Sequence, residues 1–137
     1  MESDDLVARA LAVLLEQGVT ADRRVTGVWV FGSHARGMAH SGSDLDIAVL
    51  CEPALELDRF RLMDTLARRL ERDVDVIDLD TASPTLVWEV LTTGRLIFES
   101  DALGVEAFVR HARFAAEDAE QRDRMILLAQ IAPEGGA

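Results

Sequence analysis

Two carboxylates, Asp44 and Asp46, follow the pair Gly32-Ser33 after a spacer of ten residues. Apolar residues dominate the stretch before the pair, residues 25–31, and the stretch that contains the second carboxylate, residues 45–51. The pattern predicts a strand, a turn, and a second strand that opens on acids. Carboxylates suit magnesium, and the backbone N–H groups of a tight turn suit phosphate. The segment therefore predicts a magnesium-dependent enzyme that handles a nucleoside triphosphate.

Asp44 and Asp46 stand two residues apart, so on a strand both carboxylates leave the same face. Leu45, Ile47 and Val49 then leave the opposite face and join the core. Two adjacent carboxylates repel each other unless cations lie between them. In two-metal phosphoryl chemistry, ions about 3.5–4 Å apart stabilise the attacking and leaving oxygens. The competing interpretation is a solvated strand end whose acids face water, because acid pairs of this form are common.

The turn residues would bind phosphate. Gly32 allows a tight turn and a close approach of the backbone to a ligand. Ser33 is expected to cap a short helix whose first N–H groups form an anion site. Arg36, one turn into that helix, would contact the triphosphate or form a salt bridge with a loop acid. Ser43, just before the acids, would support the loop or bind a phosphate.

A third carboxylate is expected from the strand that contains residues 73–78. Val74 and Val76 mark its core face, so Asp73 and Asp75 share the opposite face while Asp78 points away. Asp75 is the more central of the two and is the predicted site residue. It would bind one metal ion and help to deprotonate the attacking hydroxyl.

Helices and strands alternate along the chain. The predicted helices cover residues 6–17, 58–72, 84–93 and 102–124 or beyond, and the predicted strands cover residues 25–31, 44–51, 73–79 and 95–99. This order indicates an α/β or α+β fold with a small mixed sheet flanked by helices. The first two strands are too close for a parallel crossover, which favours an antiparallel pair. A single domain over residues 1–132 is expected, followed by a disordered tail, residues 133–137.

Apolar spacing predicts which helix faces lie inward. The inward face of helix 58–72 is expected to carry Phe60, Met63, Leu66, Ala67 and Leu70. The long C-terminal helix is expected to pack through Leu103, Phe108, Val109, Ala112 and Ala116. After a charged stretch, residues 117–124, a second apolar group follows: Met125, Ile126, Leu127, Leu128 and Ile131. This group could dock back on the domain, contact a partner protein or contact a second copy of the chain, and the sequence does not decide among these three.

Composition and charge argue against several classes of function. A net charge of −11 repels a phosphate backbone and argues against nucleic acid binding. One cysteine, Cys51, permits no internal disulfide, which fits a reducing, cytoplasmic setting. The N-terminus lacks the basic region of a signal peptide, and no apolar run approaches the roughly 20 residues of a membrane span. A role in the membrane is therefore not expected.

These residues resemble the DNA polymerase beta-like nucleotidyltransferases, whose signature is Gly-Ser, a spacer, Asp-x-Asp and a third Asp on a later strand. The segment GSHARGMAHSGSDLD is similar to the form found in the minimal nucleotidyltransferase (MNT) antitoxins. The stretch RDVDVIDL looks like the strand of the third Asp, and ASPTLVWEVLTTGRLIFESD looks like the region that follows it. The resemblance covers roughly residues 25–101.

The resemblance implies a nucleotidyltransferase fold with the acids at one sheet edge, and transfer of AMP from ATP to a tyrosine of a partner HEPN-domain ribonuclease toxin. It implies that Asp44 and Asp46 hold two Mg²⁺ ions and that Asp75 holds the catalytic one. Gly32 and Ser33 would bind the β- and γ-phosphates, with help from Arg36. The chain has no tyrosine, so tyrosine self-modification is excluded and an acceptor on another protein is consistent.

Two other functions compete with this one. A binding-only antitoxin would mask the toxin and use its acids little. A small-molecule nucleotidyltransferase of the aminoglycoside-modifying type usually carries an added helical domain for its acceptor. Only 36 residues (137 minus 101) follow Asp101, enough for one long helix, so this function ranks well behind.

Overall fold

The computed structural model describes residues 3–16, 25–35, 37, 44–51 and 58–131. The elements in chain order are α1 (Ser3–Glu16), β1 (Val25–Phe31), β2 (Leu45–Cys51), α2 (Arg59–Leu70), β3 (Val74–Asp78), α3 (Pro84–Thr93), β4 (Arg95–Glu99) and α4 (Ala102–Ile131). The predicted tail, residues 133–137, lies outside the described residues. The predicted domain bounds, 1–132, therefore stay a prediction.

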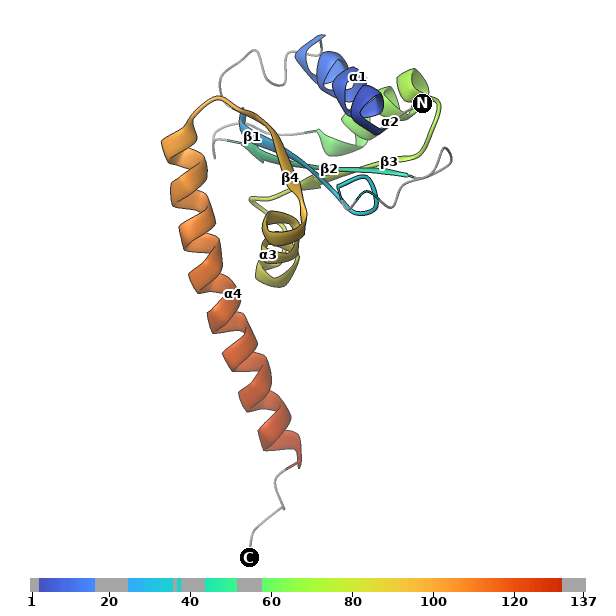
Figure 1. The fold of residues 1–137 in the computed structure, drawn as a ribbon. Helices are drawn as coiled ribbons and strands as arrows, with labels where there is room; N and C mark the ends of the chain where they lie inside the picture. Colours follow the sequence, from blue (N-terminus) through green and yellow to red (C-terminus); the bar gives the residue numbers. More distant parts are fainter. Residues whose placement is uncertain (1–2, 17–24, 36, 38–43, 52–57, 132–137) are drawn as a thin grey trace, which may run out of the picture.

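The four strands form one mixed sheet in the order β3-β2-β1-β4 (Figure 1). β1 pairs antiparallel with both β2 and β4, whereas β2 and β3 are parallel and are connected through α2. The antiparallel β1–β2 pair and the small mixed sheet flanked by helices confirm the predicted α+β fold.

Helices cover both faces of the sheet, with α1 and α2 on one side and α3 and α4 on the other (Figure 1). The alternation along β2 explains how one strand serves both cores. Ile47 and Val49 pack against the α1/α2 side, and Ala48 and Leu50 pack against the α3/α4 side. A strand buried on both faces reads as a continuous apolar run, as β2 does.

Polar capping residues mark the N-terminal ends of two helices. Asp58 caps α2 by accepting a hydrogen bond from the Arg61 backbone N–H at 3.1 Å. Ser83 caps α3 by accepting one from the Leu86 N–H at 3.3 Å, with Pro84 at the first helical position. These caps are the ones that helix-start preferences predict.

Two predicted core residues are exposed. Phe60 and Leu103 are 71% and 77% exposed, although both were expected to face inward. Each stands two residues before a buried residue of its helix, Leu62 in α2 and Val105 in α4. At about 100° per residue, two residues place a side chain on the opposite side of a helix.

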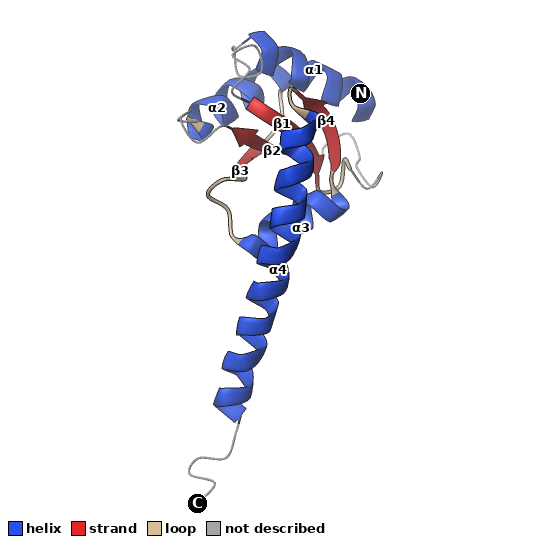
Figure 2. Ribbon diagram, turned by 90° about the vertical axis from the view of Figure 1, so that its left-hand side faces the viewer, coloured by secondary structure: helices blue, strands red, loops and turns tan. Residues whose placement is uncertain are grey.

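The long helix α4 packs on the domain only through its first half. Its buried residues are Val105 and Ala112, and beyond them α4 runs past α3 and away from the sheet (Figure 2). The sequence predicts that this helix reaches Arg124 or beyond, and in the structure α4 ends at Ile131. Within the described part of the chain, no helix is long and apolar enough to cross a membrane.

Candidate active site

The acids gather at one end of the sheet, where β1 ends and where β2 and β3 begin. Strand pairing places Phe31 beside Asp46 and Asp46 beside Asp75. Asp44 lies immediately before β2, so three carboxylates and the end of β1 share this edge. The parallel register of β2 and β3 thus brings together acids that are far apart in the sequence.

Asp46 and Asp75 open toward the same side of the sheet. Asp46 alternates with Ala48 on β2, and Asp75 alternates with Ile77 on β3, and both apolar residues belong to the core under α3 and α4. Asp46 and Asp75 are half-buried, and Asp44 is exposed. Asp46 and Asp75 therefore lie on the face of the sheet that α3 and α4 cover.

The electrostatics of Asp46 reflect this crowding. Burial raises the pKa of its carboxyl, the negative charges of Asp75 and then Asp44 raise the pKa further, and His34 lowers it. Carboxylates that repel one another at this range favour a cation or a proton between them.

Gly32 lies against Asp46 and has a left-handed φ of +70°. A Cβ atom at Gly32 would collide with the Asp46 carboxylate oxygen Oδ2. Only glycine combines this backbone conformation with this close approach. Gly32 therefore fixes the turn and leaves room for the carboxylate of Asp46.

The loop after β1 differs from its prediction. Residues 32–35, which include Ser33, form a hydrogen-bonded turn, and the described part of the loop contains no helix. Gly37 has a φ of +70°, outside the right-handed helical region, so a helix begun at Ser33 would end within one turn. Arg36 and Ser43 lie outside the described residues.

His34 was not predicted as a site residue. Its side chain is only 5% exposed. Among the described residues, no other polar or charged residue is buried. Its effect on the pKa of Asp46 places it near the acids. The sequence feature that could have identified His34 is its position directly after Gly32-Ser33. Its spacing to other possible metal-binding residues indicates no site.

The acids suit a metal ion that is shared with a substrate. Within the described ranges, no three His, Cys, Asp or Glu side chains are placed to hold an ion as a complete set. Magnesium usually takes only one or two carboxylates and completes its octahedron with waters and substrate phosphates. Asp44, Asp46 and Asp75 fit that kind of open site, because they supply charge and hard oxygen atoms at one edge.

The raised pKa of Asp46 predicts a pH-dependent gain in stability on Asp46→Asn. A group whose pKa is raised on folding stabilises the fold at low pH, and that contribution is lost as pH rises through the folded pKa. In EDTA, urea unfolding should show Asp46→Asn to be more stable than the parent chain at neutral pH. The gain should vanish below the ordinary aspartate pKa of about 3.9.

Asp73→Asn is the matched control, because Asp73 is exposed and lies at the start of the neighbouring strand. It should show no comparable gain at neutral pH. An Asp46→Asn variant that is no more stable than the parent at neutral pH would contradict the proposed crowding of charge.

Comparisons with known proteins identify the family. The model of the family "Polymerase beta, Nucleotidyltransferase" matches residues 15–103. The protein adenylyltransferase MntA of Shewanella oneidensis is 40% identical to this chain over 72 residues, 52% of each protein. The chain thus matches about half the length of that relative.

Two solved structures match over nearly the whole chain. A crystal structure of a toxin–antitoxin with AMP-PNP matches with a TM-score of 0.72 and 29% identity, over 91% of this chain and 98% of that one. A structure of tri-AMPylated Shewanella oneidensis HEPN toxin in complex with MNT antitoxin matches with a TM-score of 0.69 and 26% identity, over 97% of this chain and 100% of that one.

The family match includes the Gly32-Ser33 turn and all three acids, and it covers well over half of the chain. The solved structures share its mixed sheet and flanking helices. This chain belongs to the polymerase beta nucleotidyltransferase family.

Proposed function

We propose that this chain is a magnesium-dependent adenylyltransferase antitoxin of the cytoplasm. It transfers AMP from ATP to a tyrosine of a partner HEPN ribonuclease toxin and thereby silences it. The observation that carries this proposal is the edge where Asp46 lies beside Asp75 and against Gly32. The relatives support the substrates, because one is a protein adenylyltransferase and others are toxin–antitoxin complexes with AMP-PNP or an AMPylated toxin.

Each site residue has a proposed role. Asp44 and Asp46 hold two Mg²⁺ ions, and Asp75 holds the catalytic one. Gly32 and Ser33 present the turn to the β- and γ-phosphates of ATP. Two further residues, Arg36 and Ser43, lie outside the described residues and are proposed to assist with the phosphates.

The reaction forms one bond and breaks one. The tyrosine hydroxyl oxygen attacks the α-phosphorus of ATP, and the bond from that phosphorus to the bridging oxygen of the β-phosphate breaks. Pyrophosphate leaves with the electron pair, and Asp75 helps to remove the hydroxyl proton. Bound Mg²⁺ would supply charge neutralisation for the attacking and leaving oxygens.

The acceptor belongs to another protein. The chain contains no tyrosine, so it cannot be its own acceptor in this reaction. Its net charge of −11 favours encounter with a ribonuclease, which needs basic groups to bind RNA. The same charge would repel an RNA substrate from the acid site.

Ribonuclease activity of the toxin tests catalysis against simple masking. The toxin is incubated with this chain, ATP and Mg²⁺, separated from it, and assayed on RNA. After separation, toxin treated with the parent chain should not cleave RNA. Toxin treated with the Asp44→Ala plus Asp46→Ala variant should cleave RNA normally. Asp73→Asn serves as the control and should silence the toxin normally. Equal silencing by the double variant would instead establish a masking antitoxin.

A further inference from the structure

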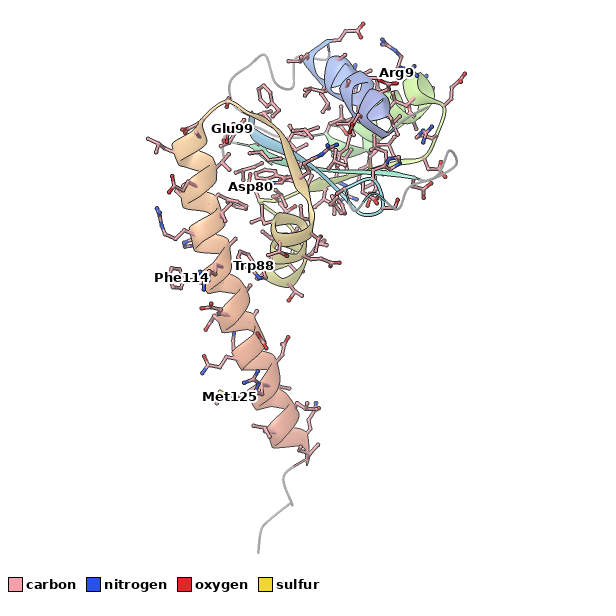
Figure 3. The ribbon with its side chains drawn as sticks, in the orientation of Figure 1. Arg9, Asp80, Trp88, Glu99, Phe114 and Met125 are labelled. Atoms are coloured by element: carbon pink, nitrogen blue, oxygen red, sulfur yellow. The ribbon has the colours of Figure 1, made fainter. Side chains whose placement is uncertain are left out.

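The end of α4 carries a group of exposed apolar side chains, here named the apolar tip. Its members are all 55–67% exposed: Met125, Ile126, Leu127, Leu128 and Ile131. The domain does not cover them, because α4 has already passed α3 at this point (Figures 1 and 2). Figure 3 shows Met125 on the same outer side of α4 as Phe114, which is itself 64% exposed.

The apolar tip is hydrophobic around the whole helix. Residues 125–128 are consecutive, and steps of about 100° distribute them over the full circumference. A helix that is hydrophobic all round is one that is enclosed by other structure. One flat surface would cover only part of the apolar tip, so its binding site must surround it.

The part of α4 just before the apolar tip is polar and solvent-exposed. It is held by three ion pairs four residues apart: Arg113–Glu117 at 3.4 Å, Asp118–Arg122 at 3.3 Å and Glu120–Arg124 at 3.1 Å. A polar helix stabilised by such pairs is typical of a solvated connection between two bodies. α4 therefore has the pattern of an arm: an anchored base, a solvated stem and an apolar end.

The arm extends on the side of the sheet that the acids face. α3 and α4 cover the face to which Asp46 and Asp75 alternate with core residues. The base of α4 lies at the other end of the strands, because Val105 packs beside Gly27 whereas Asp46 pairs with Phe31. A protein that encloses the apolar tip lies on the same face of the sheet as the acids and must reach along that face to bring an acceptor hydroxyl to them. This placement favours the acceptor protein as the occupant.

A second copy of this chain fits less well. A stable interface buries roughly 800 Å² on each partner, more than five side chains at one helix end provide. Two copies would also each carry a charge of −11. A partner that touches both the apolar tip and the acid edge gains the area that the tip lacks.

We propose that the apolar tip docks the protein acceptor of the transfer reaction. The occupant is a protein with an apolar pocket and a basic surface around it. The pocket takes the last two turns of α4, and this contact sets the affinity for the acceptor without taking part in the chemistry. The inference rests on the proposed function, because it identifies the acceptor as the HEPN toxin.

Charged substitutions in the apolar tip test the docking site. Leu127→Asp plus Leu128→Asp should weaken binding of the purified HEPN toxin at least about tenfold and raise the KM for toxin by a similar factor. The KM for ATP and the rate at saturating toxin should stay within about twofold of the parent. Circular dichroism of the variant should show that α4 remains helical.

The matched control is Leu15→Asp plus Phe60→Asp. Leu15 and Phe60 are also exposed apolar residues, 46% and 71%, but they belong to α1 and α2 on the opposite side of the sheet. This variant adds the same charge and should bind the toxin like the parent chain. An equal loss in both variants would overturn the proposal, because it would reflect net charge.

Other outcomes separate the docking site from the proposed function. AMP transfer with unchanged toxin affinity in the tip variant overturns the docking site and leaves the adenylyltransferase intact. Tip-dependent binding without any AMP transfer supports the docking site and contradicts the catalytic function. Loss of self-association as the sole effect, measured by sedimentation, would identify a second copy as the occupant and overturn the proposal.

Discussion

Asp75→Asn is expected to lower the rate of AMP transfer at least ~100-fold. The amide keeps the size of the side chain but removes the negative charge opposite Asp46. A metal ion contributes several kcal/mol to charge stabilisation in the transition state. At 1.36 kcal/mol for each factor of ten, loss of even part of that contribution reaches two orders of magnitude. Pyrophosphate release at saturating ATP and toxin measures it.

Asp73→Asn is the control that identifies the third acid. Asp73 and Asp75 alternate to the same side of β3, but Asp73 is exposed, and Asp75 is the one whose charge raises the pKa of Asp46. The Asp73 variant should keep its rate within a few-fold of the parent. A large loss on Asp73→Asn with little loss on Asp75→Asn would show that the third acid has been assigned to the wrong residue.

Gly32→Ala is expected to damage both stability and catalysis. A non-glycine residue in the left-handed region costs about 1–2 kcal/mol. The new methyl group would also collide with the Asp46 carboxylate, so that side chain must move. We expect a loss above 2 kcal/mol in urea unfolding and at least a tenfold slower transfer.

Gly37→Ala separates the two causes. Gly37 has the same φ of +70°, but nothing lies within 4 Å of a Cβ atom there. Its cost should therefore be the backbone term alone, about 1–2 kcal/mol, with normal transfer kinetics. Equal effects of the two substitutions on transfer would contradict the contact between Gly32 and Asp46 as the reason for the glycine.

Much of the fold could be predicted because local signals are strong. Ser83-Pro84 marks the start of α3, and the prediction for residues 84–93 matches the structure. The alternation of side chains along β2 and β3 is enough to predict that Asp46 and Asp75 lie on one face of the sheet. The parallel register then brings them side by side, as the proposed metal site requires.

Other features depend on packing that the sequence does not carry. The periodicity of α2 fits two adjacent inward stripes, and packing selected the one with Leu62, so Phe60 is exposed. Burial of His34 follows from the path of the turn against the sheet, which no spacing rule specifies. The separation of the apolar tip from the domain follows from the direction of α4, which is set by contacts at Val105 and Ala112.

The most direct test of adenylyl transfer is the intact mass of the HEPN toxin after incubation with this chain, ATP and Mg²⁺. The proposed function predicts a mass gain of one or more AMP groups on the toxin. That gain should disappear with Asp44→Ala plus Asp46→Ala and in EDTA. An unchanged toxin mass, in a mixture where the two proteins form a stable complex, would contradict the adenylyltransferase and leave a masking antitoxin.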